Sequence, residues 1–237
     1  MRGASAILLV IAGCLLPCSS SPALLAGPPG ATQVFRLDST GDLSLIGVTA
    51  QTVNYRGRKA LELLEARASN SQGQAVALLN GTDFTDGTIE VDLAGAPKAG
   101  APDGARGFVG IAFRSEADGS RFEYFYIRPT NGRAGDQLRR NHSTQYASHP
   151  DYPWNRLRQE NPGVYESCVD IEPGVWTRIR IVVKGTRAEL YVNRSSQPCL
   201  IVNDLKLGTA HGQIGLWIDT GTQAYFANLR VSSGARN

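Results

Sequence analysis

The sequence has 237 residues, 42% of them hydrophobic and 19% charged, with a formal net charge of +3. This length is sufficient to bury a hydrophobic core, and the small net charge argues against a nucleic-acid-binding protein. The sequence also lacks a glycine-rich phosphate-binding loop and a G-x-S-x-G nucleophile motif.

The first 26 residues have the pattern of a secretory signal peptide. Arg2 precedes an apolar run over residues 6–16, and small, turn-forming residues follow. The run is too short for a transmembrane segment, which takes about 20 apolar residues. The stretch IAGC also fits the lipobox of bacterial lipoproteins, in which Cys14 would be acylated. We therefore expect an exported protein, periplasmic, secreted or at the cell surface, with either a cleaved signal or a lipid anchor at Cys14.

From residue 27 onward, the dominant hydrophobic period is two. Apolar and polar side chains alternate over four segments, residues 87–95, 177–185, 188–193 and 226–231. Such alternation is typical of strands with one buried face. Residues 59–68 could form a helical turn or two, but their position between strands leads us to interpret residues 60–66 as a further strand. In the last segment we expect Phe226 on the face opposite Leu229. Many short strands separated by glycine-containing turns predict one all-β antiparallel sandwich over residues 27–237.

The order of these segments resembles a known superfamily. The stretches FTDGTIEVDL, GFVGIAFR, FEYFYIRP, GVWTRIRIVV, AELYVN and GQIGLWIDTGTQAYFANLRV are similar to the concanavalin A-like lectin/glucanase jelly roll. Within it, they most resemble bacterial domains related to keto-disaccharide hydrolases. The resemblance covers residues 82–231 and implies a jelly-roll β-sandwich. It does not imply one activity, because this architecture carries lectins, hydrolases, lyases and adhesion modules.

Residues 128–158, which we call the basic segment, contain six arginines and two aspartates and therefore carry a net charge of +4. Their centre reads RRNHSTQYASHPDYPW. Arginine offers fork-shaped donors to anionic or heavily hydroxylated ligands. Alternatively, these side chains are solvated, pair with acids elsewhere, or attach a long insertion to the sandwich. Because long ordered loops in compact domains are usually functional, we interpret the segment as a binding surface.

Carbohydrate is the ligand that these side chains suit best, since aromatic faces stack on sugar rings and planar polar groups bond adjacent hydroxyls. In FEYFYIRP, alternation places Tyr124, Tyr126 and Arg128 on one face of a strand. In QIGLWID, it places Trp217 and Asp219 opposite the apolar face. We expect an oligo- or polysaccharide ligand, with an acidic one as an option. The predicted ligand-binding residues are Tyr126, Arg128, Asn131, Arg140, Asn141, His142, Gln145, Tyr146, Trp154, Arg156 and Trp217.

A glycan-active enzyme on the same fold is the first alternative. The E-x-D-x-x-E pattern of jelly-roll glucanases is absent, which leaves Glu123 and Glu166 as isolated carboxylates. A hydrolase of the keto-disaccharide type would use one of them as acid or base. A polysaccharide lyase would use His142 and Tyr146 as base and acid, with Arg140, Asn141 or Gln145 holding the uronate carboxylate. A structural module of the cell envelope, without a small ligand, is the second alternative.

Two cysteines lie outside the predicted signal peptide. Cys168 and Cys199 are expected to form a disulfide in an oxidising compartment, and two separate buried thiols are the alternative. The histidines and acids show no recurrent metal-ligand spacing, so we predict no metal site and no cofactor. Structural calcium is common in the superfamily that the sequence resembles and is kept open on that ground.

Overall fold

The fold is seen in a computed structural model, which describes residues 32–66 and 74–234. The predicted signal peptide, with Cys14, lies outside the described residues. Among the helices of the described part, none is long and apolar enough to cross a membrane.

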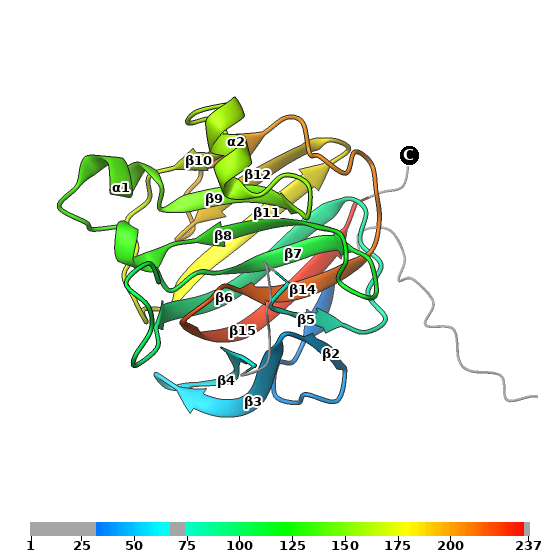
Figure 1. The fold of residues 1–237 in the computed structure, drawn as a ribbon. Coiled ribbons are helices and arrows are strands. Elements are labelled where there is room, and N and C mark those ends of the chain that lie inside the picture. The colour runs from blue at the N-terminus through cyan, green and yellow to red at the C-terminus, as the bar shows by residue number, and fades with distance from the viewer. Residues whose placement is uncertain (1–31, 67–73, 235–237) are drawn as a thin grey trace, which may run out of the picture.

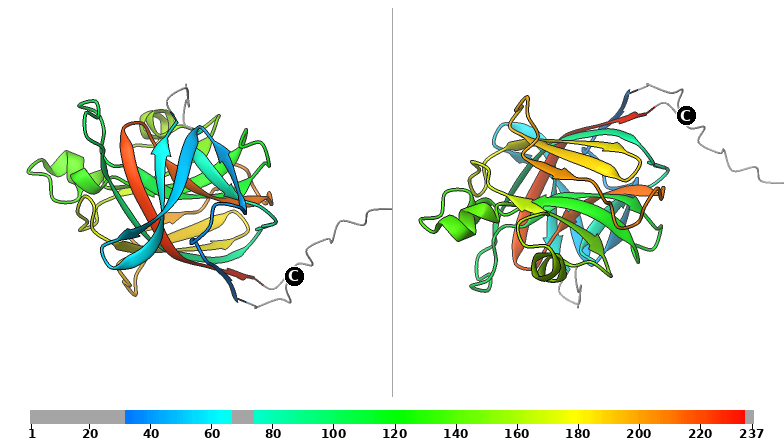
Figure 2. Two further views of the ribbon diagram at one scale, coloured as in Figure 1. Left: turned by 90° about the horizontal axis from the view of Figure 1, so that it is seen from below. Right: turned by 90° about the horizontal axis from the view of Figure 1, so that it is seen from above.

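Two antiparallel sheets pack face to face, as Figure 1 and both views of Figure 2 show. Sheet A contains, in spatial order, β13 (Leu200–Val202), β12 (Arg187–Val192), β11 (Thr177–Lys184), β6 (Gly87–Pro97), β15 (Thr222–Ser233), β4 (Arg58–Glu65) and β3 (Val48–Tyr55), with β1 (Thr32–Phe35) also paired to β15. Sheet B contains β10 (Glu166–Ser167), β9 (Thr144–His149), β8 (Phe122–Ile127), β7 (Val109–Ser115), β14 (Gln213–Ile218), β5 (Val76–Leu79) and β2 (Leu43–Ile46). Within the described residues, three short helical segments complete the fold, η1 (Pro129–Asn131), α1 (Gln137–Asn141) and α2 (Trp154–Glu160).

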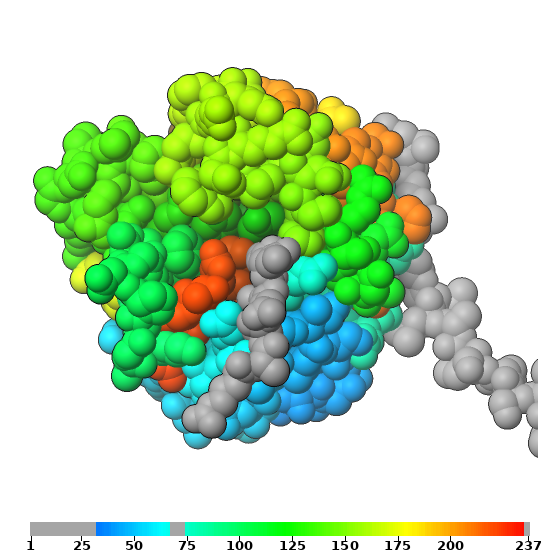
Figure 3. Space-filling model, viewed as in Figure 1, coloured from blue at the N-terminus to red at the C-terminus, as the bar shows by residue number. Residues whose placement is uncertain are grey.

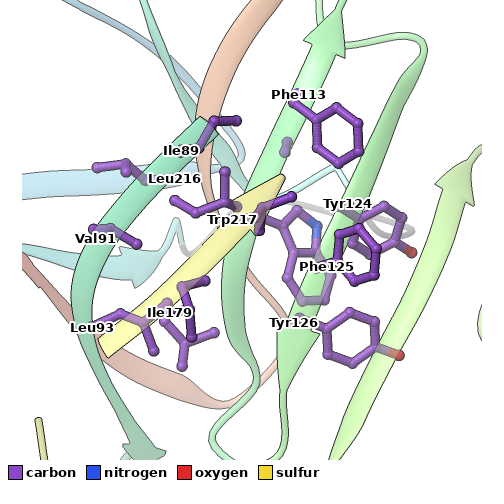
Figure 4. Close-up of a cluster of buried hydrophobic side chains, with 14 of the residues drawn as sticks. Ile89, Val91, Leu93, Phe113, Tyr124, Phe125, Tyr126, Ile179, Leu216 and Trp217 are labelled. Carbon is purple, nitrogen blue, oxygen red and sulfur yellow. The ribbon is translucent and has the colours of Figure 1, made fainter. Parts of the chain in front are cut away.

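The predicted all-β antiparallel sandwich is confirmed, and the strand predicted around residues 60–66 is β4, Arg58–Glu65. The apolar positions of the sequence alternation form the core between the sheets (Figure 4). Ile89, Val91 and Leu93 of β6 and Ile179 of β11 each expose 1% or less of their surface. Burying a side chain of this size contributes roughly 1.5–3 kcal/mol, so these strands hold the sheets together.

Strand β15 departs from simple alternation. Its pairing with β6 shifts register between Ala227 and Arg230, where Asn228 has a φ of +56°. Such a bulge reverses which side of the strand the following residues face. As a result, Phe226 before it and Leu229 after it both belong to the core. The prediction that placed Phe226 on the outer face is therefore wrong.

The basic segment is not one long loop. It folds as η1, α1, β9 and α2, and β9 enters sheet B between β8 and β10. The Asp136 carboxylate begins α1 by accepting hydrogen bonds from the backbone N–H groups of Leu138 and Arg139, a standard N-cap. Helix α2 packs on β9 at the upper edge of Figure 1. One strand of the segment, β9, is thus part of the sandwich.

The two cysteines are free thiols in this structure, in place of the expected disulfide. Cys168 is exposed, whereas Cys199 is partly buried and its Sγ donates a hydrogen bond to the Leu190 carbonyl at 3.3 Å. Burial raises the pKa of the Cys199 thiol to about 11, so it stays protonated at neutral pH.

Candidate functional site

Three aromatic rings lie together on the outer face of sheet B. Tyr126 of β8 pairs with Gly110 of β7, which pairs in turn with Trp217 of β14. Because Gly110 has no side chain, the rings of Tyr126 and Trp217 meet with their centroids 4.8 Å apart. The Tyr124 ring lies 4.8 Å from Trp217 and 5.5 Å from Tyr126. We call Tyr124, Tyr126 and Trp217 the aromatic floor, and Figure 4 shows them side by side.

The surface over this part of sheet B is hollowed. In the space-filling view of Figure 3, a depression lies between α2 and the loop that follows β6. The rings of the aromatic floor expose 5% or less, so they set the shape of the site, while the more exposed side chains around them offer most of its contacts.

Arg128 follows the aromatic floor on the same face and is only 5% exposed. Its Nη2 donates a hydrogen bond to Tyr126 Oη at 2.8 Å, and its Nη1 donates to the His142 carbonyl at 3.0 Å. The side-chain oxygen of Gln145 accepts from both nitrogens at 3.2 and 3.3 Å. Burial raises the pKa of Tyr126 to about 12, so its hydroxyl keeps its proton. These bonds fix the plane of the guanidinium group.

Three aromatic rings lie near the charge of Arg128. Its guanidinium carbon lies 4.9 Å from the Tyr126 ring centroid, 5.7 Å from that of Trp154 and 5.9 Å from that of Phe108. No carboxylate of the described residues lies within ion-pair distance of it, 4.0 Å. Burying an unpaired charge is costly, and aromatic faces offset that cost only in part. Arg128 is therefore a cation of fixed orientation that can bind a hydrogen-bond acceptor of a ligand.

A carboxylate, a guanidinium and an imidazole meet beside Arg128. Glu166 of β10 accepts from Arg158 of α2, with Nε at 3.0 Å and Nη2 at 2.7 Å. Its Oε2 also lies 2.7 Å from Nδ1 of His142. The Arg158 guanidinium covers the Trp154 ring at 4.7 Å, so this ring has an arginine near it on two sides. Trp154 itself is 41% exposed and offers an aromatic surface to a ligand.

Asp219 stands just after β14, on the same face as Trp217. Its carboxylate accepts a hydrogen bond from the Thr220 backbone N–H at 2.7 Å. Burial, and secondarily the negative charge of Glu65, raises the pKa of Asp219, while Arg128 opposes that change. The site therefore carries a cation from β8 and a carboxyl group from β14 around one aromatic floor.

The two histidines of the basic segment should make stability depend on pH. The pKa values of His142 and His149 are both lowered from 6.5, chiefly because burial disfavours the charged imidazolium. Below pH 6.5, unfolded histidines bind protons that the folded ones resist, so this part of the stability is present above pH 6.5 and declines as pH falls. We expect wild type to lose stability relative to His149→Gln between pH 7 and pH 5.5 in urea unfolding. Parallel curves for the two proteins would contradict this.

The structure brings together seven of the residues predicted from the sequence. These are Tyr126, Arg128, His142, Gln145, Trp154, Glu166 and Trp217. Asn131 supports them, because its Nδ2 donates to the His142 carbonyl at 3.2 Å.

Five other predicted residues lie apart from this group. Glu123 and Tyr146 are fully buried on the inward faces of β8 and β9 and are hydrogen bonded to each other. Glu123 also accepts from the Leu207 backbone N–H at 2.7 Å, and burial raises the pKa of its carboxyl group. The remaining side chains, Arg140, Asn141 and Arg156, belong to α1 and α2, where Asn141 bonds Gln137 and Arg156 bonds Glu160. Burial between the sheets makes Glu123 and Tyr146 inaccessible to a ligand on the outer face.

Four residues of the site were not among those predicted, namely Phe108, Tyr124, Arg158 and Asp219. Alternation had placed Tyr124 and Asp219 on this face, so the signal for both was present. Arg158 lies in the basic segment, but only its helical position on α2 directs it to Glu166. Phe108 precedes β7 and has no periodic signal of its own.

The similarity of this chain to known proteins lies in its fold. No family model and no curated protein sequence matches the chain. A Bacillus subtilis protein of unknown function with a galectin-like fold is similar, at 12% identity and a TM-score of 0.56, over 89% of this chain and 99% of that one. The carbohydrate-binding module CBM66 from Bacillus subtilis is similar at 16% identity and a TM-score of 0.51, over 79% and 97%.

This chain has a galectin-like jelly-roll fold. A Parabacteroides distasonis protein, provisionally named a glycosyl hydrolase, shares it at 12% identity and a TM-score of 0.52, over 85% of this chain and 99% of that one. These matches agree with the predicted jelly-roll β-sandwich. At such low identities they concern architecture, and one architecture hosts many activities.

Within residues 32–66 and 74–234, no group of three or more His, Cys, Asp or Glu side chains is placed to hold a metal ion.

Proposed function

We propose that the protein is an exported carbohydrate-binding domain. In this proposal, an oligo- or polysaccharide lies over the outer face of sheet B, against Trp154 and the edge of the aromatic floor. Arg128 directs its guanidinium group to a hydroxyl or carboxylate of the sugar. Export rests on the signal-like N-terminus of the sequence, with a lipid anchor at Cys14 as one form of attachment.

The observation that carries the proposal is the environment of Arg128. The Arg128 guanidinium group lies near the rings of Tyr126, Trp154 and Phe108 and forms no ion pair with a described carboxylate. The site therefore combines an aromatic surface with a charged hydrogen-bond donor, the two kinds of group that bind sugars. Ligand sites typically join aromatic surface with a few fixed polar groups. Because Arg128 forms no ion pair with a described carboxylate, we expect acidic saccharides to bind more tightly than neutral ones.

The similar folds support the same class of ligand. One of them is named a carbohydrate-binding module and another is described as galectin-like. Their identities of 16% and 12% give no guidance on which sugar or linkage this chain takes, so the choice of saccharide rests on the residues of the site.

The proposal is tested with a panel of neutral and acidic oligosaccharides, read by thermal shift and by chromatography of the reaction products. A ligand that binds the native state raises the melting temperature. Stabilisation by at least one saccharide is expected. If none stabilises the protein, the saccharide proposal fails and a structural module of the envelope becomes the better account.

Trp154→Ala is expected to weaken saccharide binding by at least about tenfold, or 1.4 kcal/mol, because it removes the most exposed ring of the site. As Trp154 is 41% exposed, its loss should change the melting temperature by no more than about 2 °C. Gln159→Ala, an exposed residue of the same helix, is the matched control and should bind as wild type does. Equal affinities for both variants in calorimetric titration would remove Trp154 from the site.

A second candidate function is a glycan-active enzyme, either a keto-disaccharide-type hydrolase or a polysaccharide lyase. The approach of His142 Nδ1 to within 2.7 Å of Glu166 Oε2 favours it, because a carboxylate can orient an imidazole for proton transfer. Arg158 holds that carboxylate in place. Product release by wild type, lost in Glu166→Gln, would support this candidate. Saccharides that bind but give no product would eliminate it.

A further inference from the structure

A second pocket lies on the outer face of sheet A, across the sandwich from the aromatic floor. Its volume is about 180 Å³. This is less than the roughly 300–1,000 Å³ of pockets that enclose drug-sized ligands, so it suits one small chemical group. We call it the arginine pocket, and its lining residues are Glu90, Arg178, Arg180, Tyr191, Arg194 and Ser195.

Strand register builds the arginine pocket. Arg180 of β11 pairs with Glu90 of β6 on one side and with Tyr191 of β12 on the other. Residues that pair across neighbouring strands point to the same face of a sheet. Their inward neighbours, Ile179 and Ile181, are buried in the core, so these three side chains point away from it.

Tyr191 gives Arg180 a fixed orientation. The Arg180 guanidinium carbon lies 3.6 Å from the centroid of the Tyr191 ring, which is within the range of a cation–π contact. The ring is held in turn, because Tyr191 Oη donates to Glu189 at 2.5 Å and Glu189 accepts from Arg187 at 2.7 Å. The Tyr191 ring covers one face of the guanidinium group. The N–H groups of Arg180 point outward in the guanidinium plane, where they can donate hydrogen bonds.

The pocket has positive charge in excess. Arg178 pairs with Glu90 at 3.3 Å, whereas Arg180 and Arg194 form no ion pair with any described residue. Asn193 and Arg194 both have positive φ, +53° and +63°, a backbone conformation that residues other than glycine seldom adopt. This turn, after β12, places Arg194 at the pocket and adds the Ser195 hydroxyl to its lining.

We propose that the arginine pocket binds one oxoanion of the sulfate type, held by Arg180 and Arg194. Guanidinium forks match the oxygens of such anions in pairs. Arg178 neutralises Glu90 and Arg187 neutralises Glu189, which leaves the charges of Arg180 and Arg194 in excess. The oxoanion is either a free ion or an ester group carried by a saccharide. This site is independent of the saccharide site on sheet B.

The test is a titration of the protein with sodium sulfate at constant ionic strength, followed by amide ¹H–¹⁵N chemical shifts. Saturable shifts are expected for Arg178–Arg180 and Tyr191–Ser195. Arg180→Gln and Arg194→Gln should each weaken sulfate binding by at least about tenfold. Arg121→Gln removes the same charge from an exposed position on the hairpin between β7 and β8 and should bind as wild type does. Trp154→Ala should also leave sulfate binding unchanged, whatever it does to saccharide binding.

A second arm uses a sulfated disaccharide and its unsulfated counterpart. Tighter binding of the sulfated sugar than of sulfate ion, lost in Arg180→Gln, assigns the pocket to an ester group. Equal affinities assign it to the free ion. Shifts that do not saturate, that sodium chloride reproduces, or that Arg121→Gln reduces as much as Arg180→Gln would overturn the proposal.

Discussion

Arg128→Met is expected to weaken saccharide binding by between about tenfold and 150-fold. Hydrogen bonds to a charged group are worth roughly 1.5–3 kcal/mol, and this substitution removes the charged donor that the aromatic rings position. Methionine keeps the length and apolar stem of the side chain. The substitution also leaves the buried side-chain oxygen of Gln145 without the two donors that Arg128 supplies, so the free energy of unfolding should fall by about 1–3 kcal/mol. Calorimetric titration and urea unfolding measure the two effects separately.

Two further variants sharpen this result. Arg128→Lys keeps the charge but not the planar fork, so binding should still fall, since the two residues are not interchangeable at a stacked site. Arg121→Met removes an exposed arginine elsewhere and should have no effect. If Arg128→Met binds saccharides as wild type does, the guanidinium group has no role in recognition, and the account of the site is wrong.

Gly110→Ala is expected to destabilise the protein by about 3 kcal/mol, at the upper end of overpacking effects. An added Cβ would lie 2.1 Å from the Phe125 carbonyl oxygen and 2.6 Å from Tyr126 Cβ. Backbone atoms of a central sheet cannot move aside cheaply, because β7 is bonded to β8 and β14 on its two edges. The same methyl group would separate Tyr126 from Trp217, so saccharide binding should fall as well.

Gly104→Ala is the matched control for this substitution. A Cβ at that position meets no atom within 4 Å, and residue 104 lies in the exposed loop after β6. Its free energy of unfolding should therefore change by no more than about 0.5 kcal/mol. Similar urea midpoints for the two variants would show that Gly110 is not needed for the packing of the aromatic floor.

Alternation in the sequence was enough to predict the two faces of the strands that form the floor. Tyr126 and Arg128 were expected on one face of β8 and Trp217 on the polar face of β14, and the structure places all three on the outer face of sheet B. This succeeds because the side-chain period of a strand is fixed at two. Which strands are neighbours depends on contacts between distant segments, so the meeting of Tyr126 and Trp217 could not be predicted.

The basic segment shows where sequence patterns are insufficient. Tyr146 was taken as a loop residue, but it lies on β9 in register with Phe125 and therefore points into the core. Glu123 has the same parity as Phe125, so alternation alone could have placed it inward. What remained hidden is its partner, because the Tyr146 hydroxyl that satisfies this carboxylate comes from the next strand. A carboxyl group seen in isolation resembles a catalytic acid until such a partner is known.

The bulge in β15 is a second case of this kind. The segment FANLRV reads as regular alternation, yet Asn228 adopts a left-handed conformation that changes the phase of the strand. Asparagine tolerates this conformation better than most residues, but it does not require it. Pairing with β6 decides the matter, and that pairing is a tertiary contact.

Binding of a saccharide over the outer face of sheet B can be mapped by amide ¹H–¹⁵N chemical shifts with the oligosaccharide that gives the largest thermal shift. We expect saturable shifts concentrated at Tyr126, Arg128, His142, Gln145 and Trp154. Shifts confined to sheet A around Arg180 and Tyr191, with no response at Arg128 or Trp154, would contradict it.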